Sequence, residues 1–207
     1  MSAPPRPTIP ILAELPRVLE TSQLVLRPFA LTDVDAVFPI VSQPEFPRMM
    51  SWAAHRDRDE TAEHVRRLVE GGNAGMTWAI THDNQVIGSI ALASIEWQVA
   101  AMRVDRGELG FWLAPAMWNK GFMTEAATAV VRFGFDTIGL HKITTECVVE
   151  NAGSRRVIEK VGFRFVGRAE DDVWREGRWW TRLLYELTSP EWPDVHTTMR
   201  VSRPRPT

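Results

Sequence analysis

A glycine-containing turn that runs directly into an alanine-rich segment is the feature of this sequence best suited to bind a ligand. The stretch 118–127 reads WNKGFMTEAA, in which Thr124 is a candidate helix cap and Glu125 falls in the first helical turn, where negative charge is favourable. The first amide groups of a helix have no partner within the helix and carry partial positive charge. We therefore expect this turn to hold a diphosphate-bearing cofactor.

The turn does not follow either of two common nucleotide-binding patterns. The sequence has no Gly-x-x-x-x-Gly-Lys-Ser/Thr, which excludes a P-loop, and no Gly-x-Gly-x-x-Gly after a strand, which argues against a dinucleotide-binding fold. On this segment alone, an ordinary strand-to-helix turn explains the residues equally well.

Three polar residues elsewhere are candidates for chemistry. Asn151 and Ser154 begin a second helix after the β-branched run 142–149, and both point to the same side of that helix. Each also has a purely local role open to it, because Asn caps helices and Ser in a first turn bonds nearby backbone. Glu108 lies in a strand in which it faces opposite Leu109. It can act as a base or form a structural ion pair with Arg103, Arg106 or Arg164.

Composition narrows the classes of protein. The chain has 207 residues, 44% of them hydrophobic and 24% charged, which is typical of one soluble domain with a sizeable core. A net charge of −2 indicates neither a nucleic-acid groove nor a surface for anionic membranes. The single cysteine, Cys147, excludes an internal disulfide, and its apolar strand predicts a buried, inert thiol. No apolar run is long enough to span a membrane, so we expect a cytoplasmic protein.

Hydrophobic periodicity predicts a mixed α/β sheet with helices on both faces and a strand–helix–strand unit at its centre. We expect about seven strands, near residues 24–29, 76–81, 86–92, 106–113, 142–149, 163–169 and 179–187. We expect helices at 33–41, capped by Thr32, at 59–70, ended by Gly71-Gly72, from the turn to about 136, and from Asn151 to just before Gly162. Residues 1–19, with five prolines, are predicted to be a flexible leader, 20–190 one domain and 191–207 a tail.

Taken together, these motifs resemble the GNAT family of acetyl-CoA-dependent N-acetyltransferases. The strand 108–113, the turn 119–126, the Asn151-x-x-Ser154 helix and the Gly162-Phe163 step occur in the order and spacing of that family, over about residues 22–190. They are most similar to the RimJ/RimL branch, which contains the ribosomal-protein alanine acetyltransferases. The resemblance implies the GNAT fold, a mostly antiparallel sheet with a β-α-β core that binds acetyl-CoA. The family's phosphate turn has other residues at the positions of Trp118 and Met123, but Gly121 is kept.

The resemblance also implies where the cofactor would bind. The backbone of Leu113 and Ala114 would lie along the pantetheine arm, and Asn151 would bond that arm. The pyrophosphate would be held by the amides of Asn119, Lys120, Gly121, Phe122, Met123 and Thr124. Lys120 either adds charge near a phosphate or is simply solvated.

The same resemblance implies direct attack by a neutral amine in a ternary complex. Glu108 matches the family's acidic position and would act as base, directly or through water. Many members use a tyrosine seven residues after the asparagine as general acid, but Ile158 stands there, and the only tyrosine, Tyr185, is on the last strand. A hydrogen bond from Ser154 or from water would then assist the leaving thiolate, and strand amides would polarise the thioester carbonyl.

The nature of the acceptor stays open in the sequence. It is a protein N-terminal amine or a small-molecule amine such as an antibiotic or polyamine, and a non-catalytic acyl-CoA-binding sensor is the alternative to an enzyme. We expect residues 30–56 and 170–180 to shape the acceptor site, with Trp52, Trp174 and Trp179 as candidates. The five histidines show no ligand spacing, so we expect no metal. We expect no nucleic acid and no membrane as partner, and a monomer or homodimer.

Overall fold

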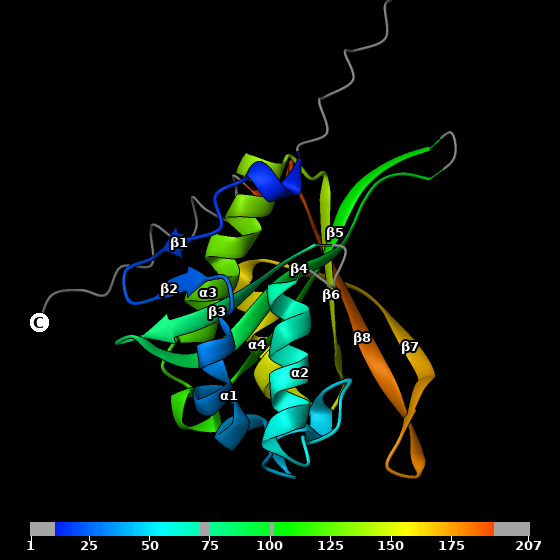
Figure 1. Cartoon of the computed structure of the whole chain (residues 1–207). Helices are drawn as coiled ribbons and strands as arrows, with labels where there is room; N and C mark the ends of the chain where they lie inside the picture. The colour runs from blue at the N-terminus through cyan, green and yellow to red at the C-terminus, as the bar shows by residue number, and fades with distance from the viewer. Residues whose placement is uncertain (1–10, 71–74, 100–101, 193–207) are drawn as a thin grey trace, which may run out of the picture.

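The computed structural model describes residues 11–70, 75–99 and 102–192, and these form an eight-stranded sheet with helices on both faces (Figure 1). The sheet order is β1-β2-β3-β4-β5-β6-β8-β7. Its strands are β1 Leu19–Glu20, β2 Val25–Arg27, β3 Met76–His82, β4 Gln85–Val99, β5 Met102–Leu113, β6 Lys142–Val148, β7 Arg164–Arg175 and β8 Arg178–Thr188. The main helices are α1 Val34–Val41, α2 Arg58–Val69, α3 Phe122–Arg132 and α4 Ala152–Val161. All neighbouring strands are antiparallel except β5 and β6, which confirms the mixed, mostly antiparallel fold.

The sheet has eight strands, rather than about seven, because β1 forms within the stretch expected to be a leader. Leu19 pairs with Leu26 of β2, and a 3-10 turn at Leu12–Glu14 precedes it. The indole N–H of Trp78 donates to the carbonyl of Arg17 at 3.0 Å. Residues 11–19 are therefore attached to the domain and do not form the extended arm that the prolines indicated. Residues 1–10 lie outside the described residues, as do 193–207 of the expected tail.

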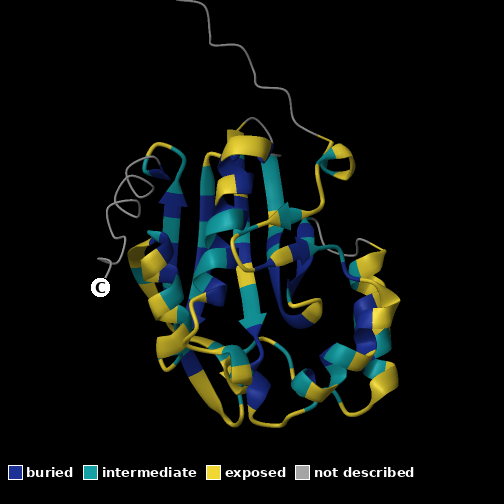
Figure 2. Cartoon of the chain, turned by 90° about the vertical axis from the view of Figure 1, so that its left-hand side faces the viewer, coloured by how far each residue is buried: buried dark blue, intermediate teal, exposed yellow. Residues whose placement is uncertain are grey.

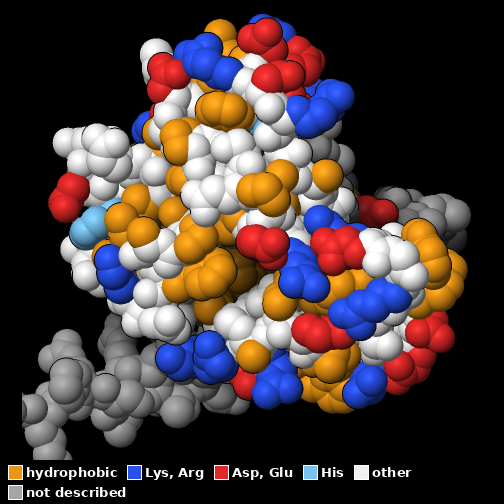
Figure 3. Space-filling view, turned by 90° about the horizontal axis from the view of Figure 1, so that it is seen from below, with side chains coloured by type: hydrophobic (Ala, Val, Ile, Leu, Met, Phe, Trp, Pro, Cys, Tyr) orange, Lys and Arg blue, Asp and Glu red, His pale blue; other side chains and the backbone are white. Residues whose placement is uncertain are grey.

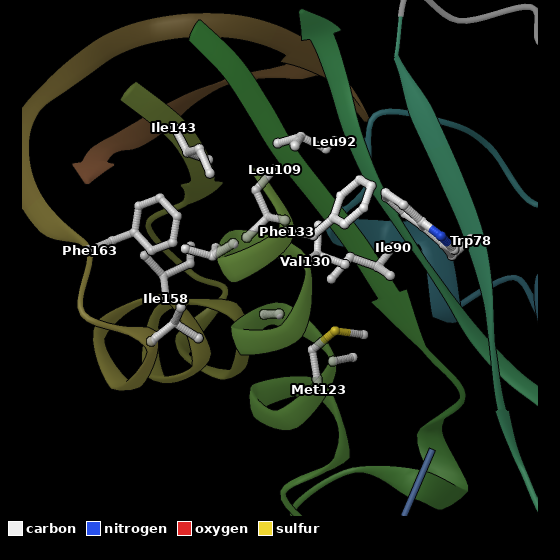
Figure 4. Close-up of a cluster of buried hydrophobic side chains, with 14 of the residues drawn as sticks. Trp78, Ile90, Leu92, Leu109, Met123, Val130, Phe133, Ile143, Ile158 and Phe163 are labelled. Carbon is white, nitrogen blue, oxygen red and sulfur yellow. The ribbon is translucent and has the colours of Figure 1, made fainter. Parts of the chain in front are cut away.

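The alternation of side chains along the strands separates two cores. Trp78 and Ile80 of β3 point into the larger cluster, which α3 and α4 cover, whereas Ala79 points into a smaller cluster under α1 and α2. Figure 4 shows the larger cluster, with Val130 and Phe133 from the α3 side packed against Leu109 and Ile143 of the sheet. The helix faces turned to the sheet are buried and the outward faces exposed (Figure 2). Helices on both faces are therefore required to cover the sheet.

Two helix starts differ from the sequence prediction. Thr32 does not cap α1. It lies inside a 3-10 turn, Leu31–Asp33, and the Asp33 carboxylate accepts from the Ala30 amide at 2.8 Å. Thr124 does not cap α3, because the helix already begins after Gly121. In both cases the helical turn begins before the residue that we expected to cap it.

The other helix boundaries follow the prediction closely, whereas several strands are longer than expected. α2 begins within one residue of the expected start, with the Asp57 carboxylate accepting from the Glu60 amide, whereas Gly71-Gly72 lie outside the described residues. α3 continues as a π-helix, Phe133–Ile138. β4 and β5 run well beyond the expected 86–92 and 106–113, as the two long strands that extend from the body in Figure 1. No helix in the described ranges is long and apolar enough to cross a membrane.

An ion pair between β2 and the start of α1 should make stability sensitive to acid. The Arg27 guanidinium bonds both oxygens of Asp33, at 2.7 and 2.8 Å, and Asp33 is only 5% exposed. Burial alone would raise the pKa of Asp33, but its bonds from Arg27 and Ala30 lower it overall. A lowered folded-state pKa gives stability that is present above the unfolded pKa, about 3.9, and is lost as the pH falls through the folded value.

We therefore predict that Asp33→Asn destabilises the protein by about 2 kcal/mol at pH 7, less than for a fully buried pair because Arg27 is partly exposed. It should also flatten the loss of stability below about pH 4. Urea unfolding between pH 3 and 7 measures both effects. Asp35→Asn, which removes only a surface pair with Arg58, is the control and should change little. Equal acid sensitivity in the wild type and Asp33→Asn would contradict the assignment.

Candidate active site

The centre of the sheet opens between its two parallel strands. β5 and β6 pair over only three positions, Arg106↔Lys142, Gly107↔Ile143 and Glu108↔Thr144. One residue further, the Thr145 hydroxyl still donates to the Leu109 carbonyl at 2.8 Å, and after that no strand of the described residues lies against this edge of β5. The result is a split between the carboxyl ends of two central strands, which is a common place for ligands in α/β sheets.

The β5 backbone presents hydrogen-bonding groups to this split. Ala114 donates its amide to Ile87 at 2.8 Å, on the side of β4, whereas the Leu113 carbonyl faces the other side and accepts from the Trp118 indole at 2.7 Å. Because backbone groups alternate along a strand, Phe111 also directs its N–H and C=O into the split. Of the two residues predicted to line a cofactor, Leu113 faces the split, whereas the Ala114 amide is already used by β4. Phe111 was missed, because side-chain patterns do not show which backbone edge stays unpaired.

The predicted phosphate turn follows directly at the end of β5. Asn119 and Gly121 both have left-handed backbones, with φ of 60° and 88°, and the first helical bond joins the Glu125 amide to the Gly121 carbonyl at 3.0 Å. A Cβ on Gly121 would meet nothing within 4 Å, so the space above the turn is open. As at any helix start, the amides of Phe122, Met123 and Thr124 have no partner four residues back. The exposed Lys120 amine lies 3.7 Å from the Met117 sulfur.

Glu125 does not fill this anion site with its own charge. Its carboxylate turns toward the chain before β2, where it accepts from the Ser22 hydroxyl at 2.9 Å and from the backbone and side chain of Gln23, each at 2.8 Å. Burial raises its pKa, but these bonds lower the pKa below its ordinary value overall. The Glu125 carboxylate thus links the segment before β2 to α3 and does not bond the first amides of the helix.

The start of α4 provides the second part of the site. The Asn151 side chain accepts from the Ser154 amide at 3.0 Å, which confirms the predicted N-cap. The Ser154 side chain forms a hydrogen bond with the buried Cys147 thiol, and this bond acts to lower the pKa of the thiol. Burial is the larger effect and raises the pKa of Cys147 to about 11. Ile158 is buried in the large core, so no acid occupies the position of the family's tyrosine.

Glu108 lies on the opposite face of the sheet from Ser154. It shares the α1–α2 face with Trp112, whereas Leu109 and Leu113 point into the core under α3. Among the described residues, no hydrogen bond or ion pair joins its carboxylate to another side chain. The three arginines considered as partners bond other acids instead, with Arg103 on Asp105, Arg106 on Glu96 and Arg164 on Glu186 and Glu191. The structure therefore offers no ion pair that accounts for Glu108.

Aromatic rings line the same face as Glu108. Trp112 packs edge-on against Phe46 with ring centres 5.9 Å apart, and Phe46 does the same with Trp52. The rings of His55 and His64 continue this row. Burial lowers the pKa of both histidines, so the row is uncharged at neutral pH. Of the three candidate tryptophans, Trp52 is thus on this face.

Trp174 and Trp179 are placed differently. They pack against each other in the β7–β8 hairpin and are 60% and 52% exposed. No group of three or more His, Cys, Asp or Glu side chains gathers anywhere in the described parts of the chain in a way that could hold a metal ion.

Similarity to known proteins points to the same kind of domain as this geometry. The family model of the acetyltransferase (GNAT) domain matches residues 23–164. The chain is 26% identical over 181 residues to the uncharacterized N-acetyltransferase YoaA of Bacillus subtilis, covering 84% of this chain and 97% of that protein. It is 32% identical over 84 residues to the ribosomal protein uS5-alanine N-acetyltransferase of Escherichia coli, which covers 41% of this chain and 43% of that one.

The fold has a counterpart among solved structures. The microcin C7 self-immunity acetyltransferase MccE, solved with acetyl-CoA and AMP, superposes with a TM-score of 0.72 at 17% identity, over 81% of this chain and 93% of that one. The split sheet, the open helix start beside it and the match over most of the domain lead to one conclusion: the chain belongs to the GNAT family of N-acetyltransferases.

Proposed function

We propose that this N-acetyltransferase moves an acetyl group from acetyl-CoA to a primary amine by direct attack in a ternary complex. The observation that carries the proposal is the split between β5 and β6, with an open helix start at its end. A slot with unpaired backbone on one wall suits the amide-rich pantetheine arm, and a helix start suits the pyrophosphate.

The cofactor would be held mostly by backbone. The amides from Asn119 to Thr124 would bind the pyrophosphate, and the Leu113 amide and the Phe111 carbonyl would bond the pantetheine arm from one side of the split. Asn151 keeps its NH₂ group to donate to the arm, because only its oxygen is used by the cap. A groove of about 910 Å³ runs from Gly121 along α3 to Lys160 and gives room for the adenosine end. The MccE structure contains acetyl-CoA, which supports this assignment.

The reaction would take place in the split, with Glu108 acting from one face of the sheet and Ser154 from the other. The amine nitrogen attacks the thioester carbon, a C–N bond forms and the C–S bond breaks. Glu108 takes the proton that the amine loses, directly or through water, and the Ser154 hydroxyl donates a hydrogen bond to the departing thiolate. The Phe111 amide, which faces the split, would bond the thioester oxygen. Cys147 takes no part, because a thiol with a pKa near 11 is protonated at neutral pH.

The acceptor we favour is the α-amine of a polypeptide terminus. Such an amine has a pKa of about 7.7–8.0 and is readily neutral, whereas a lysine amine at about 10.4 needs a stronger base. The uncharged aromatic row on the same face of the sheet as Glu108 suits an apolar acceptor better than a polycation. The E. coli relative named above acts, by its name, on an alanine of a ribosomal protein, which supports the same class.

The first test is release of free thiol from acetyl-CoA with a panel of peptide N-termini, polyamines and amine antibiotics. We predict turnover with peptide amines, and a loss of about 10²–10⁴-fold in kcat for Glu108→Gln with unchanged CoA binding. Glu96→Gln, on the neighbouring strand and paired with Arg106, is the control and should keep full activity. CoA binding without turnover of any amine would favour the non-catalytic sensor, and preferred acetylation of an antibiotic or polyamine would replace the proposed acceptor.

A second prediction concerns Gly121. Because its φ is 88° and nothing crowds its Cβ position, Gly121→Ala strains the backbone by about 1–2 kcal/mol without blocking the space above it. Relaxation of this strain should misplace the phosphate amides and weaken CoA binding about tenfold by calorimetry. Gly139→Ala, at a φ of 81° after the π-helix, carries the same strain outside the site. It should lower stability but leave CoA affinity intact, and equal losses of affinity in both variants would contradict the assignment.

A third prediction follows from the thiol pKa. At pH 8 a pKa near 11 leaves about 0.1% thiolate, against about a quarter for an ordinary cysteine. Cys147 should therefore react with a disulfide reagent at least ~100-fold more slowly than a cysteine peptide, and at the peptide's rate once the chain is unfolded in guanidinium. Cys147→Ser should retain acetyl transfer. Trapping of an acetylated Cys147 after incubation with acetyl-CoA would instead indicate a covalent route.

A further inference from the structure

Two histidines pack together where the chain enters α2. His55 lies in the segment between α1 and α2, His64 lies on α2, and their rings meet edge to face with centres 5.4 Å apart. The His55 Nδ1 is 2.9 Å from the hydroxyl oxygen of Thr61, a residue with no exposed surface. Both histidines are half-buried. We call His55 and His64 the histidine pair, and neither ring takes part in the proposed acetyl transfer.

The histidine pair holds a segment that has little backbone support. After the 3-10 turn Phe46–Met49, residues 50–57 form neither helix nor strand and reach their neighbours through isolated bonds, such as that from the His55 amide to the Val41 carbonyl at 3.1 Å. Figure 1 shows this segment at the lower end of the molecule, the end turned to the viewer in Figure 3, where hydrophobic side chains gather among acidic and basic ones. A segment of this kind depends on side-chain contacts for its position.

A row of ring contacts connects the histidine pair to β5. The His55 ring centre lies 5.8 Å from that of Trp52, Trp52 lies 5.9 Å from Phe46, and Phe46 lies 5.9 Å from Trp112. Trp112 shares its face of β5 with Glu108, because the two residues are four positions apart on one strand. A displacement of His55 would therefore loosen the packing on this face, whereas α3 and the turn before it lie on the other face.

The charged groups that act on the histidine pair all belong to α2 or to the residue before it. Burial is the largest effect and lowers the pKa of both rings. Arg67 lowers the pKa of both as well, whereas Glu60 and Asp57 act to raise that of His55 without reversing the shift. In the described parts of the chain, no charged group of α1 or of residues 46–52 shifts the pKa of either ring.

The packed arrangement therefore favours neutral rings. A histidine pKa that is lowered in the folded chain gives stability that is fully present above the unfolded value, about 6.5, and is lost as the pH falls below it. In acid both rings take up protons, and two positive charges with ring centres 5.4 Å apart repel each other and Arg67. Separation of the two rings relieves this repulsion and returns both charges to water.

We propose that the histidine pair is a pH switch: in acid its two charged rings separate, residues 50–57 leave α2, and acetyl transfer slows. Histidine suits such a role because its charge changes between about pH 5 and 8. Only the last step rests on the proposed acetyl transfer, since release of the segment is a property of the chain without substrates. The switch adds a regulation on the Glu108 face of the sheet and leaves the cofactor side unchanged.

The test compares the wild type with His64→Phe, which keeps a ring against His55 but cannot take up a proton. Hydrogen exchange of residues 46–57 is measured without substrates at about pH 8 and about pH 5.5, always comparing the two proteins at the same pH. We expect equal exchange at pH 8 and exchange about tenfold faster in the wild type at pH 5.5. His64→Arg, which is charged at every pH, should expose the segment already at pH 8.

Thiol release with a peptide N-terminus as acceptor gives the kinetic readout. The amine itself is protonated in acid, so the wild type is compared with His64→Phe at each pH. We expect equal KM for the peptide at pH 8, a KM about tenfold higher in the wild type at pH 5.5, and equal CoA affinity by calorimetry throughout. His141→Gln, which removes an exposed histidine just before β6, is the control and should follow the wild type at every pH.

The outcomes separate this inference from the proposed function. Equal exchange of residues 46–57 in the wild type and His64→Phe at pH 5.5 overturns the switch, whatever the kinetics. Faster exchange in the wild type with no difference in KM shows that the segment opens without regulating transfer, which overturns the regulatory claim. If no amine releases thiol at any pH, the proposed function fails and the regulatory claim fails with it, while the exchange data still decide whether acid opens the segment.

Discussion

The short parallel pairing of β5 and β6 is the constraint on which the rest of this structure depends. Three residue pairs hold the strands together, and the Thr145 hydroxyl then takes the bond that a fourth backbone pair would have made. A buried backbone amide without a partner is costly, so the freed edge of β5 must be satisfied by water or by a ligand. The site is thus a gap in a hydrogen-bond ladder, and the ligand that fits it is one that can complete that ladder.

The surrounding elements keep this gap from closing. α3 and α4 pack side by side on one face and bury Val130, Ile158 and Phe163 against the sheet (Figure 4). Gly134, just after α3, lets the chain approach so closely that an added Cβ would lie 2.8 Å from Ile143. β6 is held from its other side by seven pairings with β8. β6 is paired to β8 and β5 is paired to β4, so each strand beside the split is held by its other neighbour.

The division of labour across the sheet follows from strand alternation. Glu108 faces α1 and α2, while its neighbour Leu109 faces α3, so the proposed base lies on the opposite face of the sheet from the proposed Ser154 hydrogen-bond donor. The cofactor can then occupy one face and the acceptor the other, which meets the geometric need of direct transfer without a covalent intermediate. The protonated state of Cys147 agrees with this arrangement, because the one buried thiol near the gap is a poor nucleophile.

The sequence by itself determined the elements and the local chemistry. Its period-two and helical patterns located the strands and helices, and Asn151 was identified as a cap because an N-cap depends only on residues three or four apart. The sequence also located a glycine-containing turn directly before a helix, although Thr124 was mistaken for the N-cap, a position that Gly121 occupies in a left-handed conformation. These features are local, so a linear pattern contains them.

Only the tertiary structure decided how these parts meet. The unpaired edge at Phe111 depends on where two strands separate, and the Arg175 guanidinium donates to the Met50 carbonyl, which lies 125 positions away in the chain. The short strand β1 formed within a proline-rich stretch because β2 was there to pair with it, against the local preference for an extended arm. The sequence offered three arginines as ion-pair partners for Glu108, but in the folded chain each of them pairs with another acid. Long-range packing settles such choices, because many pairings are compatible with the same local pattern and only one fills the core.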